Sequence, residues 1–456
     1  MTLAIYPKRV EEESWLKRVL RRVDWTLLGV MLMLIGLGVV FIYSATAPSG
    51  HSGDYLIRQG LAAAAGILLV LLLSILPYQV LRTYSYGIYF LSVLLLLAVL
   101  LFGTRLRGTR AWLNFYWFYF QPVELTKLLL AVGLAGYVDR SLFDLGRWQG
   151  LFTPFLMLGI HLGLILLQPD FSSTLVLFPM AFILLYTAGA RVNHLLAVGA
   201  LGALSLGIPL VSTYLKFSEF RAEGHMVRLW IQQAFVETNA PFFQFWLGLC
   251  LLLVVGWWFL RQWRIVIPAF YLVSTLMVVV VGVSGSFMVK SVLKEYQRKR
   301  LIAFVNPTLD PQGAGYNILQ SEIAIGSGRL FGKGYLSGSQ AQLGFLPERH
   351  TDFVFSLIAE EGGFFLALIV LGLYFWIVWR AFDIAYMSRD RFGRWLAISI
   401  GSLFAVSGLV NVGMVMGLMP VTGLPLPFVS YGGSSLVGAC AGIGILMSIH
   451  LRRYVL

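Results

Sequence analysis

The chain has 456 residues, of which 58% are hydrophobic and only 12% are charged, and its formal net charge is +13. This balance excludes an ordinary soluble domain, in which about half of the residues are apolar and about a quarter are charged. The apolar runs are also too long for the alternating strands of an outer-membrane barrel. The composition therefore predicts an all-α polytopic integral membrane protein, because helices satisfy their own backbone hydrogen bonds in lipid. The basic excess is typical of residues that flank membrane spans, so no nucleic-acid partner is expected.

The first 26 residues form a polar, amphipathic segment that is rich in Lys and Arg. This segment lacks the short apolar core and the small-residue cleavage site of a signal peptide. We therefore expect residues 1–26 to stay on the protein and to lie along the cytoplasmic membrane surface. Residues 27–456 contain no evident linker, repeat or low-complexity tract, so we expect them to form a single membrane domain.

Apolar runs of about 20 residues, the length needed to cross the hydrocarbon core of a bilayer, recur along this domain. An even number of such spans would place both termini on the same side of the membrane. The runs predict about twelve transmembrane helices, near 27–45, 59–77, 84–103, 122–138, 151–168, 172–190, 193–213, 243–261, 265–286, 353–378, 395–415 and 428–449.

Alternate connections between these spans are short and basic. The positive-inside rule assigns such connections to the cytoplasm, so both termini are expected there. The basic residues in this set include Arg82, Arg140, Arg147, Arg191, Arg261, Arg264, Arg452 and Arg453.

A large extracytoplasmic loop, at about 287–352, is the exception to this rule. Long loops are partly exempt from it, and Lys and Arg are well suited to bind phosphate. The excess is equally consistent with an anionic extracytoplasmic ligand and with contact to lipid headgroups. The basic residues of this loop are Lys290, Lys294, Arg298, Lys299, Arg300, Arg329, Lys333 and Arg349.

The stretch GFLPERHTDFVFSLIAEEGG, which starts at Gly344, places Asp352 at the outer mouth of a predicted helix. Thr351 or Asp352 could simply cap that helix by accepting hydrogen bonds from its first free amides. Glu360 and Glu361 follow about two turns along the same helix, and ionisable groups at membrane depth are usually functional. We therefore take Asp352 as the candidate catalytic residue and the two glutamates as parts of a supporting polar network.

A second polar group lies in FQPVELTK at 120–127, where a spacing of three residues puts Glu124 and Lys127 on one helix face. The two side chains could form an internal ion pair that stabilises the bundle, or they could belong to a site. Asp170, in LLQPDFSS, could cap the next helix or join this network. Cys250 and Cys440 lie in apolar runs and are expected to be packing residues.

Glycines cluster in QGAGYN, IGSGRLFGKGYLSGSQ and SYGGSS, within the outer loop or near the outer ends of predicted helices. A glycine-rich backbone can bind anions through its amides, but the same glycines also suit plain turns. The motifs HExxH, Walker A and GxSxG and zinc-spaced cysteines do not occur, so the sequence gives those chemistries no support.

Several longer stretches closely resemble the SEDS glycosyltransferases, the family that contains RodA and FtsW. These stretches cover most of the chain in the family's order, and GKGYLSGSQAQLGFLPERHTDF is more similar to the RodA branch than to the FtsW branch. They are YSAT at 43–46, RGTRAWLNF at 107–115, FQPVELTK at 120–127, QPDFSS at 168–173, the long block at 296–363, and NVGMVMGLMPVTGLPLPFVSYGGSS at 411–435.

The resemblance implies an enzyme that polymerises lipid II into β-1,4 glycan strands at the outer face of the bacterial cytoplasmic membrane, for cell elongation and rod shape. It also implies a class B penicillin-binding protein as transpeptidase partner, and other membrane proteins of the elongation complex. The aspartate of the family's HTDF motif is essential for activity, and this position here is Asp352. The family usually has ten spans, so the region at about 193–261 is expected to insert two further helices and an outer loop.

An α-linked lipid diphosphate that yields a β-linked product requires inversion, and hence a single displacement. Such an enzyme needs one base for the acceptor hydroxyl and positive charge for the diphosphate. Asp352 is the candidate base, and a divalent cation, Mg²⁺ or Mn²⁺, could bridge phosphate oxygens, although the sequence shows no dedicated metal site. The candidates for contact with the diphosphate or the sugars are Arg110, Trp112, Arg298, Arg300, Lys333 and Arg349. The supporting polar network comprises Arg58, Glu124, Lys127, Asp170, Glu360 and Glu361.

Two other functions stay open at this point. A transporter (flippase) of a lipid-linked cell-wall precursor would fit about twelve helices with charged pairs, although transporters often show internal repeats and midplane sites. A scaffold that only recruits the penicillin-binding protein would not need Asp352 at the mouth of a cleft.

Overall fold

We describe the chain from a computed structural model. The residues described are 23–50, 52–106, 109–115, 119–141, 144–217, 240–263, 268–292, 300, 303–304 and 313–453. The predicted N-terminal surface segment therefore lies almost wholly outside the described residues, as do Arg298 and most of its neighbours in the outer loop.

Each of the twelve predicted apolar runs coincides with a helix. Within the described ranges, nine helices are long and apolar enough to cross a membrane, and two shorter apolar helices accompany them. The twelfth, α6, carries more charge and lines the centre of the bundle. The helices are α2 (Trp25–Thr46), α3 (Ser52–Ile75), α5 (Ser85–Phe102), α6 (Pro122–Arg140), α7 (Trp148–Leu167), α8 (Phe171–Thr187), α9 (Val192–Phe217), α11 (Ala240–Gln262), α12 (Ala269–Val292), α16 (Val354–Met387), α17 (Arg391–Val415) and α18 (Gly433–Leu451).

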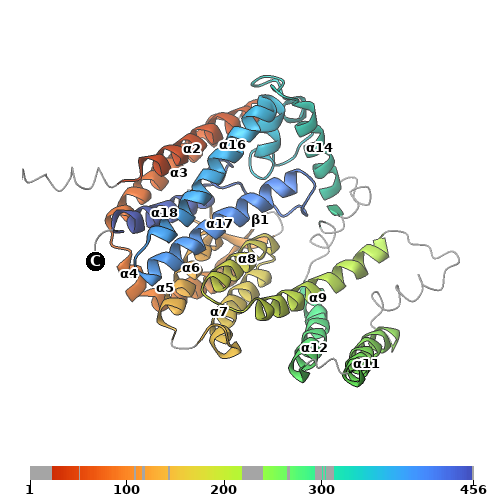
Figure 1. The fold of residues 1–456 in the computed structure, drawn as a ribbon. Coiled ribbons are helices and arrows are strands. Elements are labelled where there is room, and N and C mark those ends of the chain that lie inside the picture. Colours follow the sequence, from red (N-terminus) through yellow and green to blue (C-terminus); the bar gives the residue numbers. More distant parts are fainter. Residues whose placement is uncertain are drawn as a thin grey trace, which may run out of the picture.

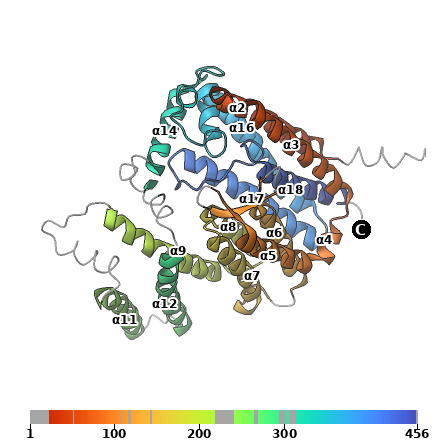
Figure 2. The same ribbon diagram turned by 180° about the vertical axis from the view of Figure 1, so that it is seen from behind.

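Nine of these helices form one bundle, whereas α9, α11 and α12 stand to one side of it (Figures 1 and 2). The helices α17 and α18 are the most enclosed of the candidate spans, with 72% of the apolar window of each buried. Only 6% of the corresponding window of α11 is buried, so this helix is almost entirely available to lipid. Whether α9 and α11 are an insertion into the family's ten-span core stays an expectation from the sequence.

Local chemistry explains where several helices begin. Asp24, Asp170 and Asp390 each accept a hydrogen bond from a backbone amide three residues on, at the start of α2, α8 and α17. Such side-chain caps satisfy amides that have no partner inside the helix. Pro122 occupies the first turn of α6, where its missing N–H is not needed.

The connection between α5 and α6 contains strands, which the sequence did not predict. It contains a small antiparallel sheet of three strands in the order β1–β2–β3, formed by Thr104–Leu106, Thr109–Asn114 and Tyr119–Phe120. The sequence RGTRAWLNFYWFYF is rich in aromatic residues that favour strands, and its pairing partners lie only a few residues apart. The sheet belongs to a connection between spans, and the predicted all-α membrane-spanning architecture is confirmed.

The outer loop also contains a helix that the sequence did not reveal, α14 (Ala314–Ser327), followed by the short α15 (Ser339–Gln342). Ser321 of α14 is fully buried, and its hydroxyl lies 2.7 Å from the hydroxyl of Ser356 and 2.6 Å from the carbonyl oxygen of Val415. The loop is therefore fixed against α16 and α17 rather than extending away from the bundle.

The helix α16 is longer than predicted and is broken. It runs for 34 residues, and Gly363 interrupts it with φ 72° and ψ −172°. A positive φ of this kind is readily adopted by glycine and is strained for other residues. The first part of α16 therefore ends at the GG of AEEGG, and the second part alone is long enough to cross the hydrocarbon core, at about 1.5 Å per residue.

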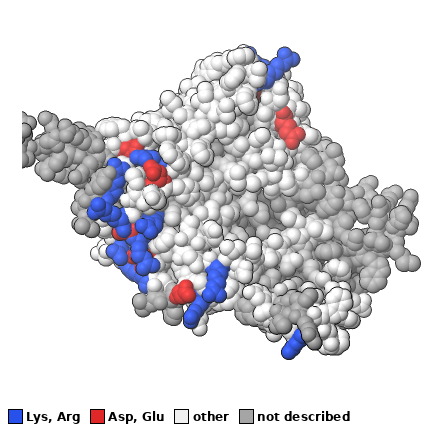
Figure 3. Space-filling model, in the orientation of Figure 1, with Lys and Arg blue, Asp and Glu red and all other residues white. Residues whose placement is uncertain are grey.

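Charged side chains gather at one end of the bundle, where α2 begins and α18 ends (Figure 3). Arg380 pairs there with Asp24 at 2.5 Å and also with Asp383, while Arg82 pairs with Asp139 at 2.7 Å. These residues belong to the connections that the charge rule assigns to the cytoplasm.

Candidate active site

Asp352 lies in a tight turn immediately before α16. The amides of Thr351 and Asp352 both donate to the carbonyl oxygen of Glu348, at 3.1 Å, and Glu348 itself has a positive φ of 51°. The N-cap residue of α16 is Phe353, and no side chain caps this helix. Neither Thr351 nor Asp352 is therefore the N-cap residue of α16, and both belong to the turn that precedes this helix.

The loop between α17 and α18 covers this carboxylate. A Cβ atom built at Gly423 would lie 3.3 Å from Oδ2 of Asp352 and 3.5 Å from Nη1 of Arg300. The same Nη1 donates to the carbonyl oxygen of Thr422 at 3.5 Å. The structure thus brings Asp352 and Arg300, two predicted site residues from distant parts of the chain, close to the same point beside Gly423.

A buried amide holds the two loops together. Asn411 of α17 is 0% exposed, and its Nδ2 donates to the carbonyl oxygens of Asp352, at 2.9 Å, and Leu424, at 2.6 Å. The position of the Asp352 backbone relative to Gly423 therefore depends on this one side chain. Asn411 was not among the residues predicted from the sequence. The one available signal was an Asn in the middle of an apolar helix, where an unpaired amide would be costly.

The glycine-rich SYGGSS segment packs against the same turn. The amide of Tyr431 donates to the carbonyl oxygen of His350 at 2.9 Å, and the rings of Tyr55, His350 and Tyr431 lie within 5.6 Å of one another, centre to centre. Gln59 holds the segment from the other side, since its Nε2 donates to the carbonyl oxygen of Ser430 at 3.3 Å. This motif therefore shapes the wall beside Asp352.

Two arginines that were predicted to bind the substrate donate hydrogen bonds to carbonyl oxygens at the C-terminal ends of helices. Nε of Arg349 donates to the carbonyl oxygen of Ala45 at 2.6 Å, in the last turn of α2, and burial lowers the pKa of Arg349. Arg110 donates from Nε to the carbonyl oxygen of Gly103 and from Nη2 to that of Leu101, at the end of α5. A cation at a helix C-terminus is stabilising, so each arginine has a structural role.

Lys333, Glu360 and Glu361 form a separate group. Lys333 Nζ lies 2.7 Å from Oε1 of Glu360, and Ser44 donates to Oε1 of Glu361 at 2.6 Å. The helical rise places Glu360 about 9 Å along α16 from its first residue, Val354. Lys333 therefore pairs with a buried carboxylate of α16, which competes with the predicted role in binding diphosphate.

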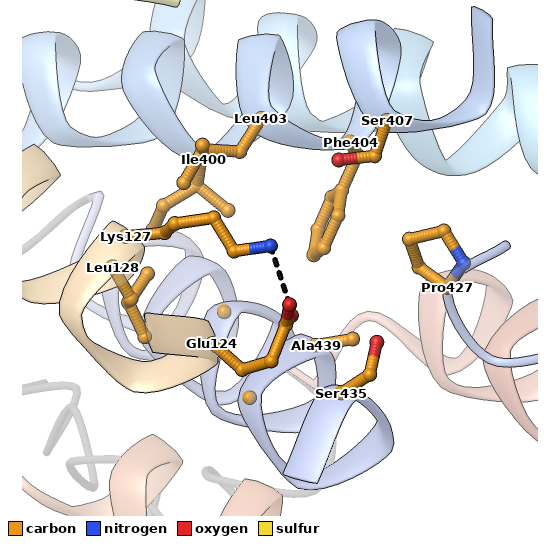
Figure 4. A pocket seen from close by; sticks show the side chains of 12 residues that line it. Glu124, Lys127, Leu128, Ile400, Leu403, Phe404, Ser407, Pro427, Ser435 and Ala439 are labelled. Carbon is orange, nitrogen blue, oxygen red and sulfur yellow. Dashed lines mark hydrogen bonds and ion pairs between the residues drawn. The ribbon is translucent and has the colours of Figure 1, made fainter. Parts of the chain in front are cut away.

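Glu124 and Lys127 line a cavity inside the bundle. Nζ of Lys127 lies 2.7 Å from Oε1 of Glu124, and the two side chains are only 9% and 10% exposed (Figure 4). The cavity has a volume of about 50 Å³, enough for more than one water molecule. Its other walls come from α6, α17, α18 and the loop before α18, through Leu128, Ile400, Leu403, Phe404, Ser407, Pro427, Ser435, Gly438, Ala439 and Gly442.

Asp170 fulfils both roles considered for it. Its carboxylate caps α8 through the amide of Ser173, at 3.2 Å, and accepts from the Ser173 hydroxyl at 2.9 Å. Burial raises the pKa of Asp170, while Ser173 and the charge of Lys127 lower it and the charge of Glu124 raises it further. Asp170 is therefore coupled electrostatically to the Glu124–Lys127 pair.

The remaining candidates lie apart from these groups. Arg58 is an exposed residue of α3, and Trp112 is a residue of β2 whose pairing partner is Thr104. Within the described residues, no group of three or more His, Cys, Asp or Glu side chains could hold a metal ion. The residues described therefore do not provide a protein cage for the predicted cation.

Comparison with known proteins agrees with the sequence resemblance. The family model named for FtsW, RodA and SpoVE, a cell cycle protein family, matches residues 24–229 and 243–454. The peptidoglycan glycosyltransferase RodA of Treponema pallidum is 35% identical over 445 residues, which cover 94% of this chain and 98% of that protein.

Solved structures give the same result. One similar chain belongs to a structure described as structural coordination of polymerization and crosslinking by a peptidoglycan synthase complex. It has a TM-score of 0.66 and 29% sequence identity, and the match covers 95% of this chain and 99% of that chain. The rod shape determining protein RodA of Thermus thermophilus has a TM-score of 0.59 and 27% identity, with 95% and 98% covered.

Proposed function

The chain belongs to the FtsW, RodA and SpoVE family, and on this premise we propose that it is a peptidoglycan glycosyltransferase that polymerises lipid II into glycan strands. The observation that carries the proposal is the arrangement of Asp352, Gly423 and Arg300. It offers a carboxylate and a guanidinium that both lie close to a residue without a side chain. A base for a sugar hydroxyl and a positive charge for a departing diphosphate are the two groups that this reaction needs.

The position of Asp352 relative to the hydrocarbon core of the membrane supports the proposal. Ser44, the partner of Glu361, lies about 30 Å along α2 from Asp24, which equals the thickness of the hydrocarbon core. Asn411, whose side chain binds the carbonyl oxygen of Asp352, lies about 30 Å along α17 from Arg391. With the basic end of the bundle in the cytoplasm, we place Asp352 at the outer hydrocarbon boundary, where the sugars of a lipid-anchored substrate begin.

In the proposed reaction, Asp352 accepts the proton of the acceptor 4-hydroxyl as the oxygen attacks the anomeric carbon of the donor. The bond from that carbon to the lipid diphosphate breaks in the same displacement, so the α-linked donor gives a β-1,4 product. Arg300 stabilises the negative charge that develops on the diphosphate. Diphosphate is already a good leaving group, so a second carboxyl group is not required, in contrast to glycosidases.

We also propose that the chain acts with a transpeptidase of the class B penicillin-binding proteins. A structurally similar chain belongs to a complex that coordinates polymerization and crosslinking. Polymer made by the present chain would then be crosslinked by its partner at the same membrane face. The similarity to RodA proteins favours a role in elongation, alongside other membrane proteins of that machinery.

The decisive experiment is lipid II polymerisation by the purified chain together with its cognate penicillin-binding protein, with the transpeptidase blocked and no class A synthase present. Wild type and Asp144→Ala, which alters an exposed carboxylate (65% exposed) away from the site, should form glycan strands. Asp352→Ala and Asp352→Asn should form none while they keep the same thermal stability.

Glycan strands from well-folded Asp352→Ala would refute the assignment of the base. If neither wild type nor any variant forms glycan strands, with accessible substrate and the correct partner, the polymerase function is contradicted. Transport of the lipid-linked precursor would then be the favoured function.

A further inference from the structure

The segment that links α14 to α15 exposes a run of apolar side chains. Leu330 is 55% exposed, Phe331 79%, Tyr335 46% and Leu336 40%. They border apolar side chains of α16, since the ring of Phe331 lies 5.4 Å from that of Phe365. A contiguous apolar surface of this kind is a binding surface for lipid or for another protein.

The contacts of this segment with two helices fix its depth. The hydroxyl of Tyr335 donates to the carbonyl oxygen of Val40 at 3.0 Å, and Val40 lies about 24 Å along α2 from Asp24. The amide of Phe365 donates to the carbonyl oxygen of Leu330 at 3.3 Å.

The ion pair of Asp24 with Arg380 marks the inner end of both helices. Phe365 lies about 22 Å along α16 from Arg380. Both contacts therefore lie about 6 to 8 Å inside a hydrocarbon core of about 30 Å, when depth is measured from that ion pair.

Irregular backbone at such a depth needs partners for its polar groups, because lipid supplies none. The break in α16 supplies them. The amides of Lys333 and Gly334 donate to the carbonyl oxygens of Glu360 and Glu361, respectively, both at 3.0 Å. In the other direction, the amide of Phe364 donates to the carbonyl oxygen of Arg329 at 2.9 Å. The backbone carbonyl and amide groups that lose their helical partners at the break near Gly363 are thus the groups that form hydrogen bonds with this segment.

This pairing also explains the glycine-rich motif IGSGRLFGKGYLSGSQ. A Cβ atom at Gly328 would lie only 1.9 Å from the carbonyl oxygen of Ala359, and one at Gly332 would lie 2.1 Å from that of Glu361. Gly332 also has a positive φ of 78°. Gly328 and Gly332 therefore allow the close approach of two backbones, and the pairing accounts for these two glycines.

We propose that residues 329–336 form a re-entrant loop that inserts its apolar side chains into the bilayer leaflet on the Asp352 side. The ion pair of Lys333 with Glu360 holds the base of this loop against α16, and the exposed Arg329 lies where it can reach lipid phosphates. The occupant of the surface is lipid, because the surface continues that of α16 and lies at hydrocarbon depth. This inference is independent of the proposed enzymatic activity.

The test measures the accessibility of a nitroxide label at position 331, in the full chain reconstituted in lipid nanodiscs. The label is attached to Phe331→Cys in a Cys250→Ala background, since Cys440 is fully buried. Power saturation compares collision with oxygen, which concentrates in lipid, and with a nickel chelate, which stays in water. The lipid control is Leu94→Cys, in the middle of α5, and the water control is Asp144→Cys.

The oxygen-to-nickel ratio at position 331 should match that at position 94 and exceed that at position 144 several-fold. A ratio like that at position 144 would overturn the proposal, because it would show that the surface faces water. The surface would then be available to a protein partner in the aqueous phase. Low collision rates with both reagents would also overturn it, because they would show that the loop is covered by protein. Leu336→Cys repeats the measurement within the same loop if Phe331→Cys does not fold.

Discussion

The side-chain amide of Asn411 donates a hydrogen bond of 2.9 Å to the backbone carbonyl oxygen of Asp352. The same nitrogen donates to Leu424, so one fully buried residue sets the distance between the turn that carries the carboxylate and the loop that covers it. The side-chain nitrogen of Asn411 donates to backbone carbonyl oxygens, and we infer that Asn411 is a positioning residue and not a catalytic one.

Asn411→Ala should lower the rate of polymerisation by about a hundredfold, because a displacement of about 1 Å at a reacting group has an effect of that order. It should also destabilise the fold by about 1–3 kcal/mol, because buried carbonyl oxygens lose their donor. Glycan synthesis and thermal unfolding measure the two effects. Ser402→Ala is the control, since Ser402 is equally buried in α17 but bonds only its own helix, at Ile398. Equal losses in both variants would contradict a specific positioning role.

Gly423→Ala should abolish most activity, because its Cβ atom would lie 3.3 Å from Oδ2 of Asp352 and 3.5 Å from Nη1 of Arg300. The variant also suffers backbone strain of about 1–2 kcal/mol, since φ at this position is +78°. Gly189→Ala separates the two effects: φ there is +103°, and nothing lies within 4 Å of the added Cβ. We expect Gly189→Ala to lose stability and keep its activity per folded molecule. Full activity of Gly423→Ala would argue against a reaction at this position.

Lys333→Met should destabilise the protein by about 3–5 kcal/mol, because it leaves Glu360, which is 0% exposed, without its counter-ion. The double variant Lys333→Met with Glu360→Gln should recover most of this loss, since no buried charge is left unpaired. Thermal unfolding of the single and double variants in detergent measures the coupling. If the two substitutions had simply additive effects, Lys333 would be acting elsewhere, for example on the diphosphate.

The positions of the spans could be predicted from the sequence because hydropathy is a local property. Each apolar run from 27–45 to 428–449 coincides with a helix. Asp170, directly before α8, caps that helix and is also coupled to the Glu124–Lys127 pair. The broken helix could not be predicted in the same way. The apolar pattern continues across Gly363, and only the partners supplied by residues 329–334 make a break tolerable at that depth.

The site was predicted in part, for a similar reason. Asp352 stood out because it follows a polar turn and precedes an apolar run, and Arg300 belongs to a conspicuous basic cluster. Asn411 did not stand out, because its role depends on two carbonyl oxygens that are 59 and 13 residues away. Lys333 and Arg349 were assigned to an anion on charge alone, whereas Glu360 and the end of α2 are their partners in the fold.

Asp170 gives a prediction on the pH dependence of stability. Burial raises its pKa in the folded protein, whereas an unfolded Asp has a pKa of about 3.9. The folded state therefore binds the proton more tightly, so this group makes the free energy of unfolding fall as the pH rises from about 4 to the pKa of the folded state. Asp170→Asn has no charge to bury and can still accept from the amide of Ser173.

Thermal unfolding of wild type and Asp170→Asn between pH 4 and pH 8 checks this sign. The variant should gain stability relative to wild type as the pH rises through that window and should keep a constant advantage above it. Asp144→Asn, at an exposed carboxylate, should show no such change. A variant that loses stability relative to wild type as the pH rises would show that attraction to Lys127 outweighs burial and that the carboxylate of Asp170 is stabilised in its charged form.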